Sequence, residues 1–208
     1  MKKNIPLLIS IVYALFFSFT YAQDQDTLTT SEWNYGVETD LYFTDPFVFL
    51  PIFTADKGKL HLEARYNYED LKTVSAWIGY NISGGEELEY FITPMVGAAA
   101  GRTNGIATGL EFTFSIIGFE LYSESEYLFD VEAKENNFFY SWTDFSYSPL
   151  DWIWFGISGQ LTGVYQTELE IERGVLLGVA YKNWQFAGYY YNAFSDDDFF
   201  MLSLTADF

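Results

Sequence analysis

Apolar and polar residues alternate along most of this chain, and the last ten residues show the pattern most clearly. The apolar positions there are Phe200, Leu202, Leu204, Ala206 and Phe208, and the positions between them are Met201, Ser203, Thr205 and Asp207. A period of two residues is typical of a β-strand with one apolar and one polar face. Terminal residues of a domain usually fray, so a strand that runs to the last residue predicts the closing strand of a barrel.

The same alternation recurs upstream, and no segment has a helical period long enough to predict a helix. Short stretches rich in Gly, Asn, Asp, Ser and Pro separate the alternating segments at regular intervals, which predicts one domain. The predicted strands are Trp33 to Phe43, Pro46 to Thr54, Leu60 to Tyr68, Thr73 to Asn81, Leu88 to Ala98, Ile106 to Ile116, Phe119 to Asp130, Phe138 to Tyr147, Trp152 to Gly163, Glu172 to Lys182, Trp184 to Asn192 and Phe199 to Phe208.

The predicted fold class is therefore all-β, a single antiparallel up-and-down β-barrel with twelve strands that spans a membrane. Residues 23–208 provide about 15 residues for each of twelve strands, and a tilted transmembrane strand takes about 9–11 of them. Ten strands are the alternative, because Pro51 makes the segment from Pro46 to Thr54 a poor central strand.

The terminal phenylalanine and the strand before it resemble those of bacterial outer-membrane β-barrel proteins. In that family the final strand alternates and ends in Phe, which the barrel assembly machinery recognises, so the resemblance implies that Phe208 is an assembly signal. It also implies a Gram-negative outer membrane as the location, with membrane lipid and lipopolysaccharide as partners.

The beginning of the chain predicts a signal peptide over residues 1–22, followed by the barrel domain over 23–208. Lys2 and Lys3 precede a largely apolar run, and Thr20, Tyr21 and Ala22 place small residues at the cleavage site. We therefore expect signal-peptide-dependent export to the outer membrane.

Charged residues fall on one phase of the strands and large apolar residues on the other, which predicts a polar lumen and a lipid-facing outer wall. From Leu60 to Tyr68, for example, the apolar phase includes Tyr68, and the polar phase includes Asn67. The predicted lumen residues are Glu38, Asp40, His61, Glu63, Arg65, Glu89, Glu111, Glu120, Glu124 and Glu126. Aromatic girdles at the membrane surfaces are predicted from Trp33, Tyr90, Trp152, Tyr181, Trp184 and Tyr190.

Composition supports this interpretation, because half of the residues are hydrophobic and 21% are aromatic, yet the net charge is −19. Such a charge makes nucleic acid an unexpected partner. There is no cysteine, which excludes disulfides and thiolate metal sites. No motif predicts a cofactor, and the only weak metal candidates are Asp196, Asp197 and Asp198.

The predicted function is a small channel or uptake barrel whose acidic lumen favours cations, with small cationic solutes as partners. The alternative is a structural or lipid-interacting barrel that is closed by ion pairs, in which Arg65 meets Glu63 or Glu111. A third interpretation, a soluble periplasmic barrel that binds an apolar ligand, requires every strand to face the opposite way. No catalytic residue is predicted: His61 lacks the Ser partner of outer-membrane phospholipases, although a hydrolase stays an open alternative.

Overall fold

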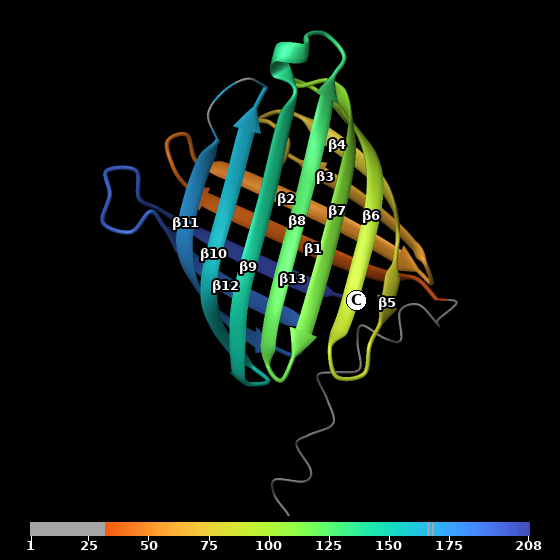
Figure 1. The fold of residues 1–208 in the computed structure, drawn as a ribbon, viewed down its shortest axis with the longest axis vertical. Coiled ribbons are helices and arrows are strands. Elements are labelled where there is room, and N and C mark those ends of the chain that lie inside the picture. Colours follow the sequence, from red (N-terminus) through yellow and green to blue (C-terminus); the bar gives the residue numbers. More distant parts are fainter. Residues whose placement is uncertain (1–31, 166, 168) are drawn as a thin grey trace, which may run out of the picture.

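The structure, a computed structural model, describes residues 32–165, 167 and 169–208. The predicted signal peptide therefore lies outside the described residues. Strands and one short 3₁₀ turn, η1 (Lys134–Asn136), make up the fold (Figure 1). The strands are β1 (Asn34–Phe43), β2 (Val48–Lys57), β3 (Leu60–Tyr66), β4 (Val74–Tyr80), β5 (Ile82–Gly84), β6 (Glu89–Ala100), β7 (Gly105–Ile116), β8 (Phe119–Asp130), β9 (Phe138–Leu150), β10 (Ile153–Val164), β11 (Glu170–Tyr181), β12 (Trp184–Tyr191) and β13 (Phe199–Asp207).

All strands pair antiparallel with their neighbours, and the sheet closes on itself. β1 pairs with β13, and β4 pairs with β6, so no long edge is left open. β4 and β5 pair with consecutive parts of β6 and together form one stave, which makes the barrel twelve-stranded. The twelve-strand prediction is thus confirmed, and the ten-strand alternative is wrong.

Pro51 belongs to the regular strand β2, although a proline was expected to make this segment a poor central strand. β2 pairs with β1 along its whole length, but its pairing with β3 begins only at Ile52. Pro51 therefore lies where β2 has a single partner strand, and the missing N–H is tolerated as it is on a sheet edge.

Two segments that fall between the predicted strands are also parts of strands. Ser83 and Gly84 continue the stave of β4, and the turn begins only at Gly85, whose φ is +102°. Ser148 and Pro149 extend β9 to Leu150, and an irregularity in the register with β10 follows between Ile153 and Phe155. Turn-prone residue types therefore indicated where each turn is to be found, but a prediction based on them begins the turn a few residues too early.

The two ends of the barrel differ in the length of their connections. At the end that carries both ends of the described chain, the connections have two to four residues, whereas at the other end they have four to seven. Outer-membrane barrels have short periplasmic turns and longer external loops, so this asymmetry indicates a periplasmic terminal end. Below, the two ends are called the terminal end and the loop end.

The outer wall of the barrel is apolar. Mid-strand residues such as Ile78, Val96 and Ile157 expose 52–61% of their surface on the outside, while the residues between them point inward. A soluble barrel that binds an apolar ligand would have the reverse orientation, so that interpretation does not fit. The part of the chain that the structure describes has no helix long and apolar enough to span a membrane.

Four interior-facing or strand-end aromatic rings lie directly over a glycine on the neighbouring strand. The pairs are Trp77 with Gly97, Trp154 with Gly178, Tyr191 with Gly174 and Tyr90 with Gly84. In each pair a side chain on the glycine would lie within 3 Å of the ring. Glycine thus provides room for the large aromatic rings, a cross-strand arrangement that also stabilises sheets containing glycine.

Replacing Gly178 by valine is expected to destabilise the barrel by about 1–3 kcal/mol, because the new side chain overlaps the Trp154 indole. Urea unfolding of the refolded protein, followed by gel mobility with and without heating, measures the change. Gly159→Val is the matched control, because only a backbone oxygen 3.8 Å away lies near its missing side chain. Equal losses in both variants would show that strand glycine itself, rather than the Trp154 contact, sets the stability.

Candidate functional site

An ion cluster centred on Arg65 lies inside the barrel. Arg65 is 3% exposed, and its guanidinium lies within 3.5 Å of four glutamates on β3, β7 and β8. The shortest contacts are 2.6 Å, from Nε to Glu63 Oε1 and from Nη1 to Glu124 Oε1; Glu126 and Glu111 lie at 3.3 and 3.5 Å. One guanidinium therefore lies among four carboxyl groups from three strands.

Two aromatic rings enclose the same guanidinium. Its central carbon lies 4.2 Å from the ring centre of Tyr68 and 4.8 Å from that of Trp77. The prediction that Tyr68 faces lipid is therefore wrong. The alternation ends at Asn67, whose φ of +62° turns the backbone after β3 and directs Tyr68 inward.

His61 belongs to a second polar network, which lies nearer the terminal end. Its Nδ1 is 2.9 Å from Asp56 Oδ1, and its Nε2 is 3.4 Å from Glu63 Oε2. Asn81 also donates to Asp56, and Thr93 donates to Asn81. Both ring nitrogens of His61 thus meet carboxylates, and the described contacts do not pair this histidine with a nucleophile.

The wall opposite Arg65 carries a network around Asp144 of β9. Its carboxylate accepts hydrogen bonds from Trp142 Nε1 at 2.8 Å, from Ser158 Oγ at 2.5 Å and from Tyr189 OH at 3.0 Å. Ser158 continues the network to Tyr191, with which it shares a hydrogen bond of 2.6 Å. Asp144 therefore has a hydrogen-bond donor on each of its carboxylate oxygens.

Bulky side chains fill the interior toward the loop end. One buried cluster contains Trp142, Leu176, Ala187, Tyr189, Tyr191 and Met201, with Tyr42 and Tyr140 packed against it. A second contains Trp77, Met95, Ala99, Ala107 and Leu128. Tyr68 and Tyr140 meet edge to face with ring centres 5.6 Å apart, which joins the side of Arg65 to the opposite wall. We call Tyr42, Tyr68, Tyr140 and Tyr191 the tyrosine barrier.

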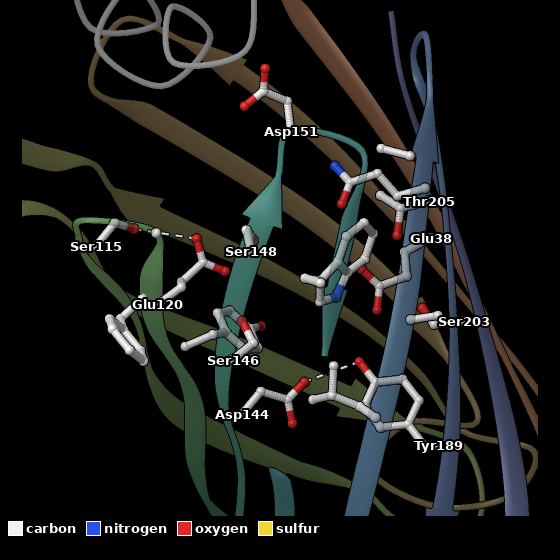
Figure 2. Close-up of a pocket in the computed structure, with 18 of the residues that line it drawn as sticks. Glu38, Ser115, Glu120, Asp144, Ser146, Ser148, Asp151, Tyr189, Ser203 and Thr205 are labelled. Atoms are coloured by element: carbon white, nitrogen blue, oxygen red, sulfur yellow. Dashed lines mark hydrogen bonds between the residues drawn. The ribbon is translucent and has the colours of Figure 1, made fainter. Parts of the chain in front are cut away.

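A cavity of about 420 Å³ occupies the interior on the other side of the tyrosine barrier. Its lining extends from the turns of the terminal end, at Gly118 and Asp151, to Glu124 and Trp142 in the middle of the barrel. Figure 2 shows Asp151 at the end of β9 and Asp144 deeper, where Tyr189 donates to it. The cavity is therefore a vestibule that opens at the terminal end.

The residues predicted for the lumen lie in the vestibule, in the ion cluster or in the His61 network, with the exception of Asp40. Glu38, Glu89, Glu120 and Glu124 line the vestibule, and Glu63, Arg65, Glu111 and Glu126 form the ion cluster with Glu124. His61 lies in the neighbouring network, and Asp40 is fully buried on β1. Asp144, Trp142, Trp154 and Tyr189 were not predicted. Asp144 and Trp142 lie on β9, whose outer face also carries Ser141 and Thr143, so alternation gave no clear signal there. Trp154 and Tyr189 are aromatic residues on the inward phase of β10 and β12, where a polar lumen predicts polar residues.

The predicted girdle residues gather mainly at one end. Trp33, Tyr90, Trp152, Tyr181 and Trp184 lie in or beside the short connections of the terminal end, and Tyr190 lies near the loop end of β12. Phe208 is 67% exposed, and its backbone exchanges hydrogen bonds with Tyr35 of β1. The terminal residue thus lies on the outer wall, at the seam where the barrel closes.

Asp196, Asp197 and Asp198 lie in the exposed connection between β12 and β13. Asp198 accepts a hydrogen bond from Tyr190, and the backbone of Asp197 bonds Asn192 and Ser195. Among the described residues no three His, Cys, Asp or Glu side chains converge as they would around a metal ion. The three aspartates therefore do not form a metal site in this conformation.

One more acid, Asp70, links two connections at the loop end. It accepts hydrogen bonds from Arg102, from Thr103 Oγ1 at 3.0 Å and from the Leu71 N–H at 2.8 Å. Partial burial raises the pKa of Asp70, but these bonds and the Arg102 charge outweigh burial and lower that pKa overall. Since the folded pKa lies below the unfolded one, this contribution to stability is present at neutral pH and is lost as the pH falls through the folded pKa.

A closed antiparallel barrel with an apolar outer wall and a polar interior has the architecture of outer-membrane porins. Among solved structures, the chain is similar to a KdgM porin, with a TM-score of 0.56, 11% identity, and coverage of 83% of this chain and 99% of that chain. It is also similar to a KdgM porin in complex with disordered oligogalacturonate, with a TM-score of 0.58, 12% identity and the same coverage. No protein-family model and no curated protein sequence matches the chain. The similarity in three dimensions establishes the porin-like fold.

Proposed function

We propose that the protein is an outer-membrane barrel that admits small cationic solutes. The observation that carries this proposal is the charge of the interior, where the guanidinium of Arg65 faces four glutamates and the vestibule is lined by further acids. Rings of carboxylates in a low-dielectric pore attract cations and repel anions.

The charge also sets this barrel apart from a similar structure. One KdgM porin was solved in complex with an oligogalacturonate, which carries carboxylates. The interior of this chain repels such a ligand, because its own carboxylates outnumber the cations Arg65, His61 and Lys182. We infer that the same fold here carries solutes of the opposite charge.

The tyrosine barrier is the narrow part of the proposed path. Tyr68 and Tyr140 meet across the interior, and Gln160 bonds both Tyr42 and Tyr191. Passage of a solute requires these rings to rotate away from one another. A narrow, gated barrel is therefore a better description than an open pore.

A second candidate function, a closed structural barrel, is favoured by the same ion cluster. Arg65 is held by Glu63 on two nitrogens and by two aromatic rings, an arrangement that resists movement. If the tyrosine barrier never opens, the protein stabilises the membrane or contacts lipid without conducting ions.

Planar bilayers distinguish the two candidates. We expect stepwise current from the refolded protein, and in a salt gradient a reversal potential of the sign given by cation selectivity. The double variant Glu111→Gln and Glu124→Gln is expected to move that potential toward zero, while Glu135→Gln, in the exposed turn η1, leaves it unchanged. Anion selectivity would contradict the proposal, and a folded barrel without current would support the closed barrel.

A further inference from the structure

We propose that the vestibule is a binding site for a linear organic polyamine. This inference deepens the proposed function, because it names the class of cation that the barrel takes up. It depends on the distribution of charge with depth in the vestibule, on one buried carboxylate without a hydrogen bond, and on the aromatic wall between the charged regions.

Carboxylates surround the inner end of the vestibule. Glu38 of β1, Glu124 of β8 and Asp144 of β9 come from different parts of the barrel wall and all contribute to its lining. Asp144 is hydrogen-bonded to three donors, and Glu124 is paired with Arg65, but Glu38 makes no hydrogen bond or ion pair among the described contacts. The Glu38 carboxylate is thus available to a ligand.

Asp40 is a second acid beside this inner end that lacks a full set of donors. It is the next inward residue of β1 after Glu38, and it lies opposite Ser203, which lines the vestibule. Its side chain is completely buried, and the Ser203 hydroxyl lies beside it, but neither carboxylate oxygen has a hydrogen bond of good geometry. Burying a carboxylate without donors is costly, so such a group points to a partner that the chain itself does not supply.

A second set of carboxylates lies at the mouth of the vestibule. Glu89, Glu120 and Asp151 line it near the short turns of the terminal end, and Lys182 is the only Lys or Arg among its described lining residues. Glu120 and Glu124 are four positions apart on β8, which separates the mouth from the inner end by about 13 Å along the strand. A ligand that meets both sets needs positive charges at both of its ends.

Aromatic rings line the vestibule between the two charged regions. Trp142 and Tyr189 meet edge to face with ring centres 5.5 Å apart, and Trp154 lies over Gly178 closer to the mouth. Aromatic faces bind ammonium groups, and they also pack against methylene chains. The volume of about 420 Å³ lies in the range of small-molecule pockets, so a flexible chain with amino groups fits the site.

A metal ion fits the vestibule less well. A hard cation requires several oxygen ligands that converge within about 2.0–2.6 Å of one point. The vestibule carboxylates are instead distributed along its depth, and no three acidic side chains in the described residues converge as they would around a metal ion. The arrangement thus favours an extended polycation over a compact one.

Calorimetric titration of spermidine into the refolded full-length barrel in detergent tests the site. We expect saturable binding that Glu38→Gln weakens by about tenfold, the loss typical of one charged hydrogen bond. Asp151→Asn, in an exposed turn, is a second variant that removes one charge at the mouth, and it is expected to weaken binding as well. Glu135→Gln, which removes one charge at the loop end, is the matched control and is expected to leave binding unchanged.

Absence of spermidine binding would overturn the inference, and so would equal losses in Glu38→Gln and Glu135→Gln, because these would indicate attraction to the net charge alone. The titration does not require an open path through the barrel. Binding without current would therefore uphold the site while contradicting the transport function, and cation-selective current without spermidine binding would do the reverse.

Discussion

Replacing Arg65 by methionine is expected to lower the free energy of unfolding by about 3–5 kcal/mol, the usual cost of removing one partner from a buried ion network. The guanidinium is 3% exposed and lies within 3.3 Å of carboxylate oxygens of Glu63, Glu124 and Glu126, whereas His61 contacts Glu63 alone among these three. Without it, these carboxylates repel one another in a low-dielectric interior. Urea unfolding of the variant in lipid vesicles, monitored by tryptophan fluorescence, measures the loss.

Two further variants identify the origin of that loss. Combining Arg65→Met with Glu63→Gln, Glu124→Gln and Glu126→Gln is expected to restore most of the stability, because the buried charges are then removed together. Arg102→Met breaks the ion pair between the exposed Arg102 and Asp70 at the loop end. This change is expected to have a much smaller effect. A variant Arg65→Met as stable as the parent would show that the ion cluster does not hold the barrel together.

The strands of this barrel could be predicted from the sequence because each carries one apolar and one polar face. The strand β8 was predicted with the same bounds as observed, Phe119–Asp130, and the alternation in β3 gave the inward positions of Glu63 and Arg65. Alternation fails where the backbone leaves the pleat. Asn67, in a left-handed conformation, reverses the facing that the pattern assigns to Tyr68.

The composition of the ion cluster could be predicted only in part. The sequence suggested that Arg65 pairs with Glu63 or Glu111, since Glu63 is two residues away on the same face. The contacts to Glu124 and Glu126 depend on the registers of four strand pairs between β3 and β8, each of which must be known to within one residue. A single sequence does not determine these registers, so the meeting of four glutamates at one arginine required the structure.

The vestibule also could not be predicted, because it forms only when the barrel closes. Its lining comes from β1 and from β6 to β13, and β1 joins the other strands around the vestibule only after it pairs with β13. Asp144 was missed because the outer face of β9 carries Ser141 and Thr143, so both phases of this strand look polar. Hydroxyl pairs between β8 and β9 satisfy these outward side chains, which explains how a polar patch is tolerated on a lipid-facing wall.

Replacing Tyr140 by alanine is expected to raise the single-channel conductance severalfold, because it removes the ring that meets Tyr68 across the tyrosine barrier. The vestibule already extends from the terminal end to Trp142, two residues from Tyr140 on β9. Removing a large ring at that position joins the vestibule to the space on the loop side. The same change removes buried apolar contacts and is expected to cost about 3–5 kcal/mol, so unfolding is measured in parallel.

Tyr147→Ala is the matched control, because Tyr147 lies on the same strand but faces outward, where its ring contacts Phe119 and Phe155. Loss of this ring removes a similar volume from the outer wall and is expected to leave conductance unchanged. A folded Tyr140→Ala barrel with parental conductance would show that the tyrosine barrier does not limit passage. The limiting group would then be the Arg65 cluster, since it is the other set of side chains that extends from β3 to β8 across the interior.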